Sequence, residues 1–227
     1  MKFVRFIPLL TVLIFANCKM DKKQEVSTPI NEPTVLDKIA LAHGFDQWNN
    51  VAQISFTFNV DRDSNHFERA WVWNTMSNEV THISGTDTLV YNRRQMDSTA
   101  LKTNAGFIND RYWLLAPFNL IWDQGNFTYT HMEAEIAPIS KKPMQKLTIV
   151  YGTDGGYTPG DAYDLYFEDD FLIREWVFRK TNQEEPSLTT TWEDYIDHQG
   201  FNFALSHKKA NEDFNIYFDD VTIIKKQ

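Results

Sequence analysis

The sequence is poor in several residue types, and each shortage narrows the classes of protein it can belong to. Its 227 residues include one cysteine, 9 glycines and 8 prolines. A single cysteine excludes an internal disulfide, and sparse glycine and proline exclude collagen-like and low-complexity chains. The 22 basic residues are outnumbered by 31 acidic ones and form no cluster. The net charge of -9 argues against nucleic acid binding and against electrostatic docking on anionic lipid.

Aromatic and hydrophobic side chains are abundant. Hydrophobic residues make up 42% of the chain and aromatic residues 15%. The mean hydropathy of -0.44 excludes a polytopic membrane protein. A chain of this length forms one or two domains, and its aromatic side chains can bury a large area in a core.

The start of the chain has the features of an export signal. Lys2 and Arg5 precede an apolar run over 6–16, which is too short to span a hydrocarbon core of about 30 Å. It has the length of a signal-peptide h-region. Cys18 follows directly and resembles the lipid-attachment residue of a bacterial lipoprotein signal, although Phe15 and Asn17 depart from the usual box. The alternative is an ordinary secretory signal with an incidental cysteine.

These features predict three segments. The segment 1–17 is a lipoprotein signal peptide, 18–33 is a flexible polar tether, and 34–227 is a single domain. The mature protein is expected to carry palmitate or a similar acyl group on Cys18 and to be anchored in the cell envelope. The outer membrane is the expected location, on its periplasmic or its surface face.

The domain begins with a predicted helix, and period-two alternation of apolar residues then dominates. Thr34 and Asp37 form a weak capping box, and Gly44 is a plausible helix stop. The alternation predicts about 11 antiparallel strands. They are expected over 53–60, 66–74, 79–84, 87–93, 127–133, 143–151, 162–168, 171–180, 188–196, 200–208 and 214–224.

One apolar segment, 105–122, breaks this alternation. It predicts a helix over Ile108–Ala116 that ends before Pro117, because the residue preceding a proline disfavours the helical region. A helix so apolar needs cover on more than one side. The hollow of a curved sheet provides it.

Three short motifs in the domain form a recognisable set. They are His43-Gly44 with Trp48, Val51 and Ile54-x-Phe56; Asn109-Asp110-x-Tyr112-Trp113-Leu114-Leu115-x-Pro117-Phe118; and Ser206-His207. Together they resemble the motifs of a group of small flavobacterial, or more broadly Bacteroidetes, lipoproteins. That group has the incomplete-barrel fold of the periplasmic lipoprotein carrier and its outer-membrane receptor, the LolA/LolB-like fold.

The resemblance implies a mainly β fold with helices (α+β). A strongly curved antiparallel sheet would form a half-open barrel, with the N-terminal helix and the helix near 108–116 covering its concave face. A curved, helix-covered sheet encloses a hollow wherever side chains do not fill it. The candidates for lining it are Phe56, Phe58, Trp71, Trp73, Trp113, Leu114, Trp122 and Trp176. The competing interpretation is that these side chains simply fill a core.

Signals for catalysis and metal binding are weak. The six histidines show no metal-ligand spacing, and no serine-hydrolase elbow or phosphate-binding glycine loop is present. His43 at a helix end suits a dipole-stabilising cap or a packing residue, and His207 a half-buried hydrogen-bonding residue. Asp61-x-Asp63-x-Asn65 copies the first ligands of a calcium loop but lacks the later ones, so a hairpin turn is expected. No cofactor is expected.

The sequence supports three hypotheses about function. The first is a non-enzymatic envelope lipoprotein that binds a lipid, an acyl chain or a lipidated protein in the hollow of the sheet. The second is an envelope protein–protein interaction module with a filled core. The third is an enzyme whose catalytic residues are dispersed along the chain. A continuous apolar cavity of several hundred Å³ would separate the first from the second.

Overall fold

The computed structural model describes residues 32–227, and Pro33–Gln227 forms one compact unit. The predicted signal peptide at 1–17, the acylation site at Cys18 and all but the last two residues of the 18–33 tether lie outside the described residues. The described residues contain the whole of the segment 34–227 that the sequence assigns to a single domain.

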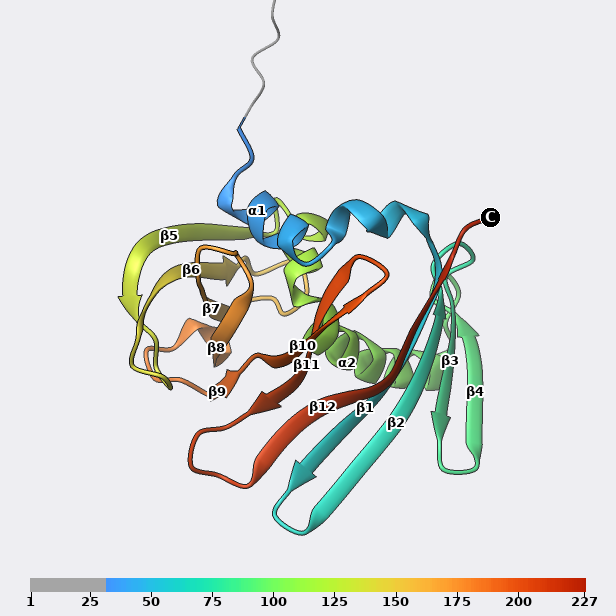
Figure 1. The fold of residues 1–227 in the computed structure, drawn as a ribbon. Helices are drawn as coiled ribbons and strands as arrows, with labels where there is room; N and C mark the ends of the chain where they lie inside the picture. The colour runs from blue at the N-terminus through green and yellow to red at the C-terminus, as the bar shows by residue number, and fades with distance from the viewer. Residues whose placement is uncertain (1–31) are drawn as a thin grey trace, which may run out of the picture. The chain divides into compact units, whose positions relative to one another are not determined.

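Four helical segments and twelve strands make up this unit (Figure 1). The helical segments are α1 (Val35–Ala42), η1 (Phe45–Asn50), α2 (Ser98–Trp122) and η2 (Lys180–Asn182). The strands are β1 (Val51–Arg62), β2 (Asn65–Asn74), β3 (Glu79–Ser84), β4 (Asp87–Asn92), β5 (Phe127–Ile136), β6 (Pro143–Tyr151), β7 (Ala162–Phe167), β8 (Ile173–Arg179), β9 (Leu188–Thr191), β10 (Glu193–His198), β11 (Phe201–Lys208) and β12 (Phe214–Lys225).

The strands form two curved antiparallel sheets that do not close into a barrel. The larger sheet has the order β10-β11-β12-β1-β2-β3-β4, and the smaller has the order β5-β6-β7-β8-β9. Most neighbouring strands in each sheet also follow one another in the sequence. The pairing of β1 with β12 is different, because it brings together strands from the two ends of the domain. The predicted class, mainly β with helices and a half-open curved architecture, is confirmed. The strands number twelve and divide into two sheets, whereas about 11 in one sheet were expected.

The extra strand comes from a break within the segment predicted as one strand over 188–196. The chain leaves the smaller sheet after β9 and enters the larger sheet at β10, with Trp192 between them. Trp192 is only 2% exposed and packs against the rings of Trp176 and His207. No glycine or proline marks this crossing, so the alternation continues through it unbroken.

Helix α1 begins and ends as the sequence predicts. The Thr34 hydroxyl accepts from the backbone N–H of Asp37, and the Asp37 carboxylate accepts from the backbone N–H of Thr34 at 2.8 Å. His43 is the C-cap, and Gly44 follows with φ +90°. A Cβ on Gly44 would lie 2.2 Å from the carbonyl oxygen of Gly200, so this position requires glycine.

Helix α2 is much longer than the predicted 108–116: it begins ten residues earlier, at Ser98, and continues to Trp122 because Pro117 bends the helix and does not end it. Asp97 caps its N-terminus by accepting from the backbone N–H of Ala100 at 2.8 Å. Leu115 leaves helical geometry, with φ -119° and ψ 20°, and the helix resumes beyond it. Proline lacks an N–H and clashes with the carbonyl four residues earlier, which produces such kinks.

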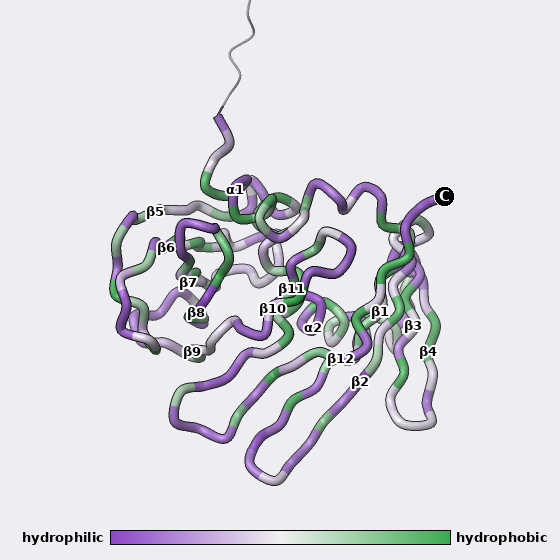
Figure 2. The backbone as a smooth tube through the Cα atoms, viewed as in Figure 1, coloured by the Kyte–Doolittle hydropathy of each residue, from purple (hydrophilic) through white to green (hydrophobic). Residues whose placement is uncertain are grey.

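Helix α2 lies behind strands β10, β11 and β12 in Figure 1, and its buried residues join both sheets in one hydrophobic core. Every residue from Tyr112 to Leu120 is buried, so this half of the helix is covered on all sides, as its apolar sequence predicts. The tips of the β1–β2 and β11–β12 hairpins, in contrast, are mostly hydrophilic (Figure 2). The Asp61–Asn65 segment forms the first of these tips, which confirms the predicted hairpin turn.

A charged cluster attaches α2 to the larger sheet. Asp110 on α2 is fully buried and accepts from the Arg69 guanidinium through both carboxylate oxygens. The indole N–H of Trp71 donates to the same carboxylate at 2.8 Å, and the Asn109 amide donates at 3.1 Å. Arg69 and Trp71 both belong to β2. Four donors therefore satisfy a carboxylate that would otherwise be costly to bury.

Replacing Asp110 by alanine should destabilise the domain by about 3–5 kcal/mol, because it leaves Arg69 and the Trp71 indole without their acceptor. Urea unfolding followed by far-UV circular dichroism measures the loss. Asp87→Ala, at an exposed position of β4, is the matched control and should change stability by about 0.5 kcal/mol or less. A loss below about 1 kcal/mol for Asp110→Ala would show that the cluster does not hold the helix.

Candidate functional site

The eight side chains predicted to line a hollow are nearly all buried, and two of them line the same cavity. Trp113 on α2 and Trp176 on β8 line it, with their ring centroids 4.5 Å apart. The other six pack into the core or, for Trp122, at its edge: Phe56, Phe58, Trp71, Trp73, Leu114 and Trp122. The filled-core interpretation therefore describes most of the interior.

The cavity lined by Trp113 and Trp176 is the candidate site, and we call it the aromatic pocket. Its volume is about 200 Å³, and it lies between α2 and the smaller sheet, against β7, β8 and β9. Its lining residues are Asn109, Trp113, Tyr157, Thr158, Tyr163, Trp176, Phe178 and Leu188. Most of these side chains are aromatic or aliphatic, and none of them is charged at neutral pH.

Burial keeps the tyrosines of the aromatic pocket neutral. It raises the pKa of Tyr157 and of Tyr163 well above the usual tyrosine range, because the phenolate form is poorly solvated there. The Tyr163 hydroxyl lies 2.8 Å from the Thr158 hydroxyl, and the Tyr157 hydroxyl lies 3.5 Å from Asn109 Oδ1. The pocket thus offers apolar faces with a few neutral polar groups, which suits an uncharged slender guest.

The β6–β7 loop forms one wall of the aromatic pocket. It places the ring of Tyr157 flat against that of Tyr112 on α2, with centroids 3.6 Å apart and planes within 4°. Gly156 has φ +75°, and a Cβ there would lie 2.5 Å from the Tyr151 ring. Only glycine allows the loop to pass so close to this ring. Gly156 is therefore needed to form this wall of the pocket, which the sequence alone did not indicate.

His207 lies beside this site and differs from its predicted role. It is fully buried among Trp113, Trp192 and Phe218, and neither ring nitrogen has a hydrogen-bond partner within residues 32–227. Burial lowers its pKa to about 3, and the nearby backbone of Thr191 opposes part of this shift without completing a hydrogen bond. The prediction of a half-buried hydrogen-bonding residue is wrong.

His43 is a packing residue and not a cationic cap. It is buried at the end of α1, with Nδ1 2.8 Å from the Ile39 carbonyl oxygen and Nε2 3.1 Å from the Tyr195 hydroxyl. Burial lowers its pKa to about 4, so it is neutral at pH 7 and cannot act on the helix dipole as a charge. Of its two predicted roles, packing is confirmed.

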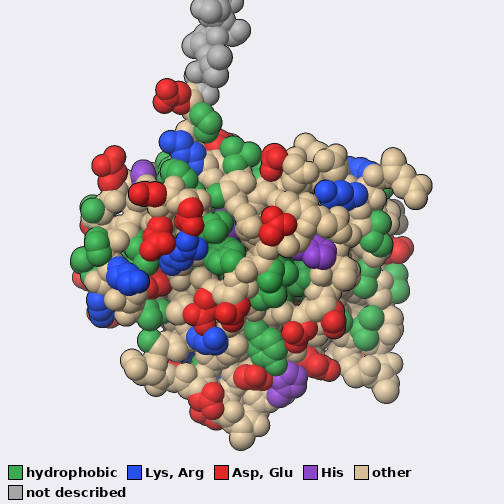
Figure 3. Space-filling view, in the orientation of Figure 1, with side chains coloured by type: hydrophobic (Ala, Val, Ile, Leu, Met, Phe, Trp, Pro, Cys, Tyr) green, Lys and Arg blue, Asp and Glu red, His purple; other side chains and the backbone are tan. Residues whose placement is uncertain are grey.

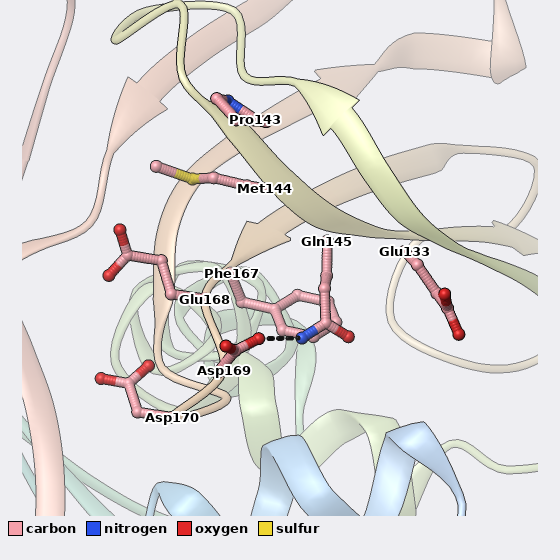
Figure 4. A pocket seen from close by; sticks show the side chains of 8 residues that line it. All are labelled: Glu133, Pro143, Met144, Gln145, Phe167, Glu168, Asp169 and Asp170. Atoms are coloured by element: carbon pink, nitrogen blue, oxygen red, sulfur yellow. Dashed lines mark hydrogen bonds between the residues drawn. The ribbon is translucent and has the colours of Figure 1, made fainter.

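A larger cavity, about 510 Å³, is polar and lies elsewhere, by the Glu168–Asp170 turn after β7 (Figure 4). Glu133, Glu168, Asp169 and Asp170 line it together with Pro143, Met144, Gln145 and Phe167. Gln145 donates to Asp169 at 3.3 Å, and Arg174 pairs with Glu168 at 3.1 Å and with Asp170. Arg174 pairs with two of the four carboxylates, so the surface stays acidic and does not suit an apolar guest.

The described residues were compared with the requirements for a metal site and for a membrane-spanning helix. Across residues 32–227, no three or more His, Cys, Asp or Glu side chains converge as metal ligands. Within the same range, none of the helices combines the length and the hydropathy needed to cross a membrane. Acidic side chains are spread over the face shown in Figure 3, with basic ones among them.

No family model and no curated protein matches the sequence, but solved structures resemble the fold. A LolA superfamily protein from Nitrosomonas europaea superposes with a TM-score of 0.51 over 85% of this chain and 93% of its own, at 11% identity. A DUF1329 family protein from Desulfovibrio piger gives 0.48 over 83% and 92%, also at 11% identity. The first likeness shows that the domain has a LolA-like fold, as the sequence motifs suggested.

Six residues of the aromatic pocket were not predicted from the sequence: Asn109, Tyr157, Thr158, Tyr163, Phe178 and Leu188. Tyr163 and Phe178 occupy alternating positions in predicted strands, so the period-two pattern could have suggested them. Tyr157 and Thr158 lie in the β6–β7 loop, where no periodicity points to the interior.

The two buried histidines should make the domain sensitive to acid. Their pKa values fall from 6.5 in the unfolded chain to about 4 for His43 and about 3 for His207, so only the unfolded chain takes up protons as the pH drops below 6.5. The free energy of unfolding therefore decreases as the pH falls below 6.5, by about 1.4 kcal/mol per pH unit for each of these two histidines until its folded-state pKa is reached. Above pH 6.5 this contribution to stability is fully present.

Urea unfolding at several pH values between 6.5 and 4 measures this slope. His207→Leu should reduce the slope attributable to histidine by about half, whereas His131→Leu, at an exposed position of β5, should leave it unchanged. An equal slope in wild type and His207→Leu would contradict the burial of a neutral imidazole at this position.

Proposed function

We propose that this protein binds a slender apolar group, such as an acyl chain, in the aromatic pocket. The observation that carries the proposal is the pocket itself, a neutral cavity of about 200 Å³ between α2 and the smaller sheet. Its walls are tryptophan, tyrosine, phenylalanine and leucine side chains, which favour transfer of hydrocarbon from water. Within residues 32–227 we find no metal-ligand cluster and no charged group in its lining, so we propose a non-enzymatic binding role.

The size of the pocket limits the guest. Sites for drug-sized ligands occupy about 300–1,000 Å³, so this pocket suits a single chain and not a complete two-chain lipid. The Tyr112–Tyr157 stack forms part of the boundary of the pocket, next to the β6–β7 loop. A lipid, a free fatty acid or the acyl chain of a lipidated protein all present the required chemistry.

A pocket-filling substitution tests the proposal. Leu188→Trp adds a bulky ring to the pocket wall and should weaken binding of a fluorescent fatty acid by about tenfold or more. Leu101→Trp, at a 55% exposed position on α2, is the matched control and should bind as wild type does. Fluorescence titration of the purified full-length protein measures both affinities, and circular dichroism checks that each variant is folded.

Two results would count against the proposal. One is a fatty-acid probe that does not bind the wild-type protein. The other is a probe that binds equally tightly to wild type and Leu188→Trp, because the guest would then lie outside the aromatic pocket.

A second candidate function is binding of a partner protein through an exposed sheet edge. Strand β5 is an outer strand of the smaller sheet, and Tyr129, Met132 and Ile136 on it are 44%, 45% and 60% exposed. Such an edge can pair with a strand of another chain. The filled core agrees with this candidate, which gains if wild-type protein takes up no fatty acid.

We further propose, from the sequence, that the chain is a lipid-anchored envelope protein of the flavobacterial group it resembles. Cys18 would carry the acyl anchor after removal of 1–17. Radiolabelled palmitate fed to the host should label the wild-type protein and not Cys18→Ala. Label that persists in Cys18→Ala, or that never enters the wild-type protein, would exclude acylation of this cysteine.

A further inference from the structure

Two arginines contact the same tryptophan near the middle of the molecule. Arg93 follows β4, and Arg111 lies on α2. The guanidinium carbon of Arg93 lies 5.8 Å from the centre of the Trp73 ring, and that of Arg111 lies 5.5 Å from it. Arg111 also lies 5.0 Å from the centre of the Trp122 ring. Two positive charges thus share one aromatic cluster.

Neither arginine forms an ion pair within residues 32–227. Arg93 donates through Nε to the side-chain oxygen of Asn104 at 3.1 Å, while Nε of Arg111 is buried without a hydrogen-bond partner there. Arg69, Arg174 and Arg179 each pair with a carboxylate. In a chain with 31 acidic residues, two neighbouring partly buried arginines without an acidic partner are an exception that needs a cause.

The pair is unfavourable as it stands. Burial, followed by the nearby charge of Arg93, lowers the pKa of Arg111 to about 10. Both arginines remain charged at neutral pH, so they repel each other in a poorly solvated place. Contacts between a cation and an aromatic ring offset only part of the cost of burying these charges. The negative charge of Asp123 partly offsets this shift in the pKa of Arg111, but its carboxylate accepts from the Asn119 amide at 2.8 Å and the Tyr151 hydroxyl at 3.0 Å and forms no ion pair with either arginine within residues 32–227.

We propose that Arg93 and Arg111 form a binding site for the oxyanion headgroup of an amphiphile, a carboxylate or a phosphate. Guanidinium groups donate paired hydrogen bonds to either oxyanion, and a bound anion would relieve the repulsion between them. The ring of Trp48 packs against those of Trp73 and Trp122, at centroid distances of 5.5 and 5.0 Å. Trp48 and Trp122 are partly exposed. These rings offer an apolar surface beside the charges. The site is independent of the aromatic pocket.

Three probes distinguish the parts of this site. Oleate carries both an oxyanion and a chain, oleyl alcohol carries the chain alone, and inorganic phosphate carries the anion alone. Tryptophan fluorescence of the full-length protein reports binding, because Trp73 and Trp122 contact Arg111. Every variant is made in a Leu188→Trp background, which fills the aromatic pocket, so that only the arginine site is measured. In that background, oleate should bind at least tenfold more weakly when Arg111→Gln or Arg93→Gln is added. Arg94→Gln, at the exposed neighbouring position, is the matched control and should leave binding unchanged.

The other probes identify the source of the anion. Oleyl alcohol should bind equally with and without Arg111→Gln, since it has no charge to lose. If inorganic phosphate binds as tightly as oleate, and its binding also depends on the arginines, the site recognises an oxyanion but not an amphiphile. That result would overturn the assignment of the site to an amphiphile. In the Leu188→Trp background, oleate that binds equally with and without Arg93→Gln or Arg111→Gln, or that does not bind at all, would overturn the proposal.

Thermal unfolding separates a binding role from a structural one. If the two arginines serve to bind an anion, Arg111→Gln should leave the melting temperature of the ligand-free protein unchanged or raise it, because the substitution removes an unpaired charge. A melting temperature lowered by several degrees would show that Arg111 serves the core through its tryptophan contacts, and would overturn the proposal.

Discussion

The contact between Arg69 and Asp110 is the interaction on which the arrangement of the domain depends. It joins β2 of the larger sheet to a fully buried carboxylate on α2, and Trp71 shares that carboxylate. A buried carboxylate tolerates few alternative positions, because each would leave it without donors. The position of α2 along the sheet is thereby fixed, and with it the positions of the aromatic side chains that the helix presents to both sheets.

With the helix fixed in this way, aromatic packing fills most of the concavity that a LolA-like fold provides. Trp73 and Phe107 pack edge to face within the larger sheet's half of the core. The aromatic pocket remains between α2 and strands β7, β8 and β9, and the β6–β7 loop forms one further wall of it. Two places of different chemistry result, a neutral aromatic pocket on one side of the helix and a pair of arginines on tryptophan rings on another.

The local elements could be predicted from the sequence, and their long-range partners could not. Period-two alternation and turn residues located most strands closely, β6 at its observed bounds. The start of α2 was missed although Asp97 and the spacing of Ala100, Asn104 and Phe107 indicate it. The crossing at Trp192 leaves no local signal. Asp110 meets a partner 41 positions away, and no pattern in one sequence reveals such a pair.

The same limit applies to the candidate site. Trp113 and Trp176 were predicted as lining residues because they are large and apolar, but so were six residues that only pack. Whether a buried ring borders a cavity depends on side chains from other elements. A crystal structure of the protein with an ω-brominated fatty acid is the decisive experiment for the aromatic pocket. We expect an anomalous bromine peak between Trp113 and Trp176, and bromine bound only at other sites would show that the pocket does not hold the chain.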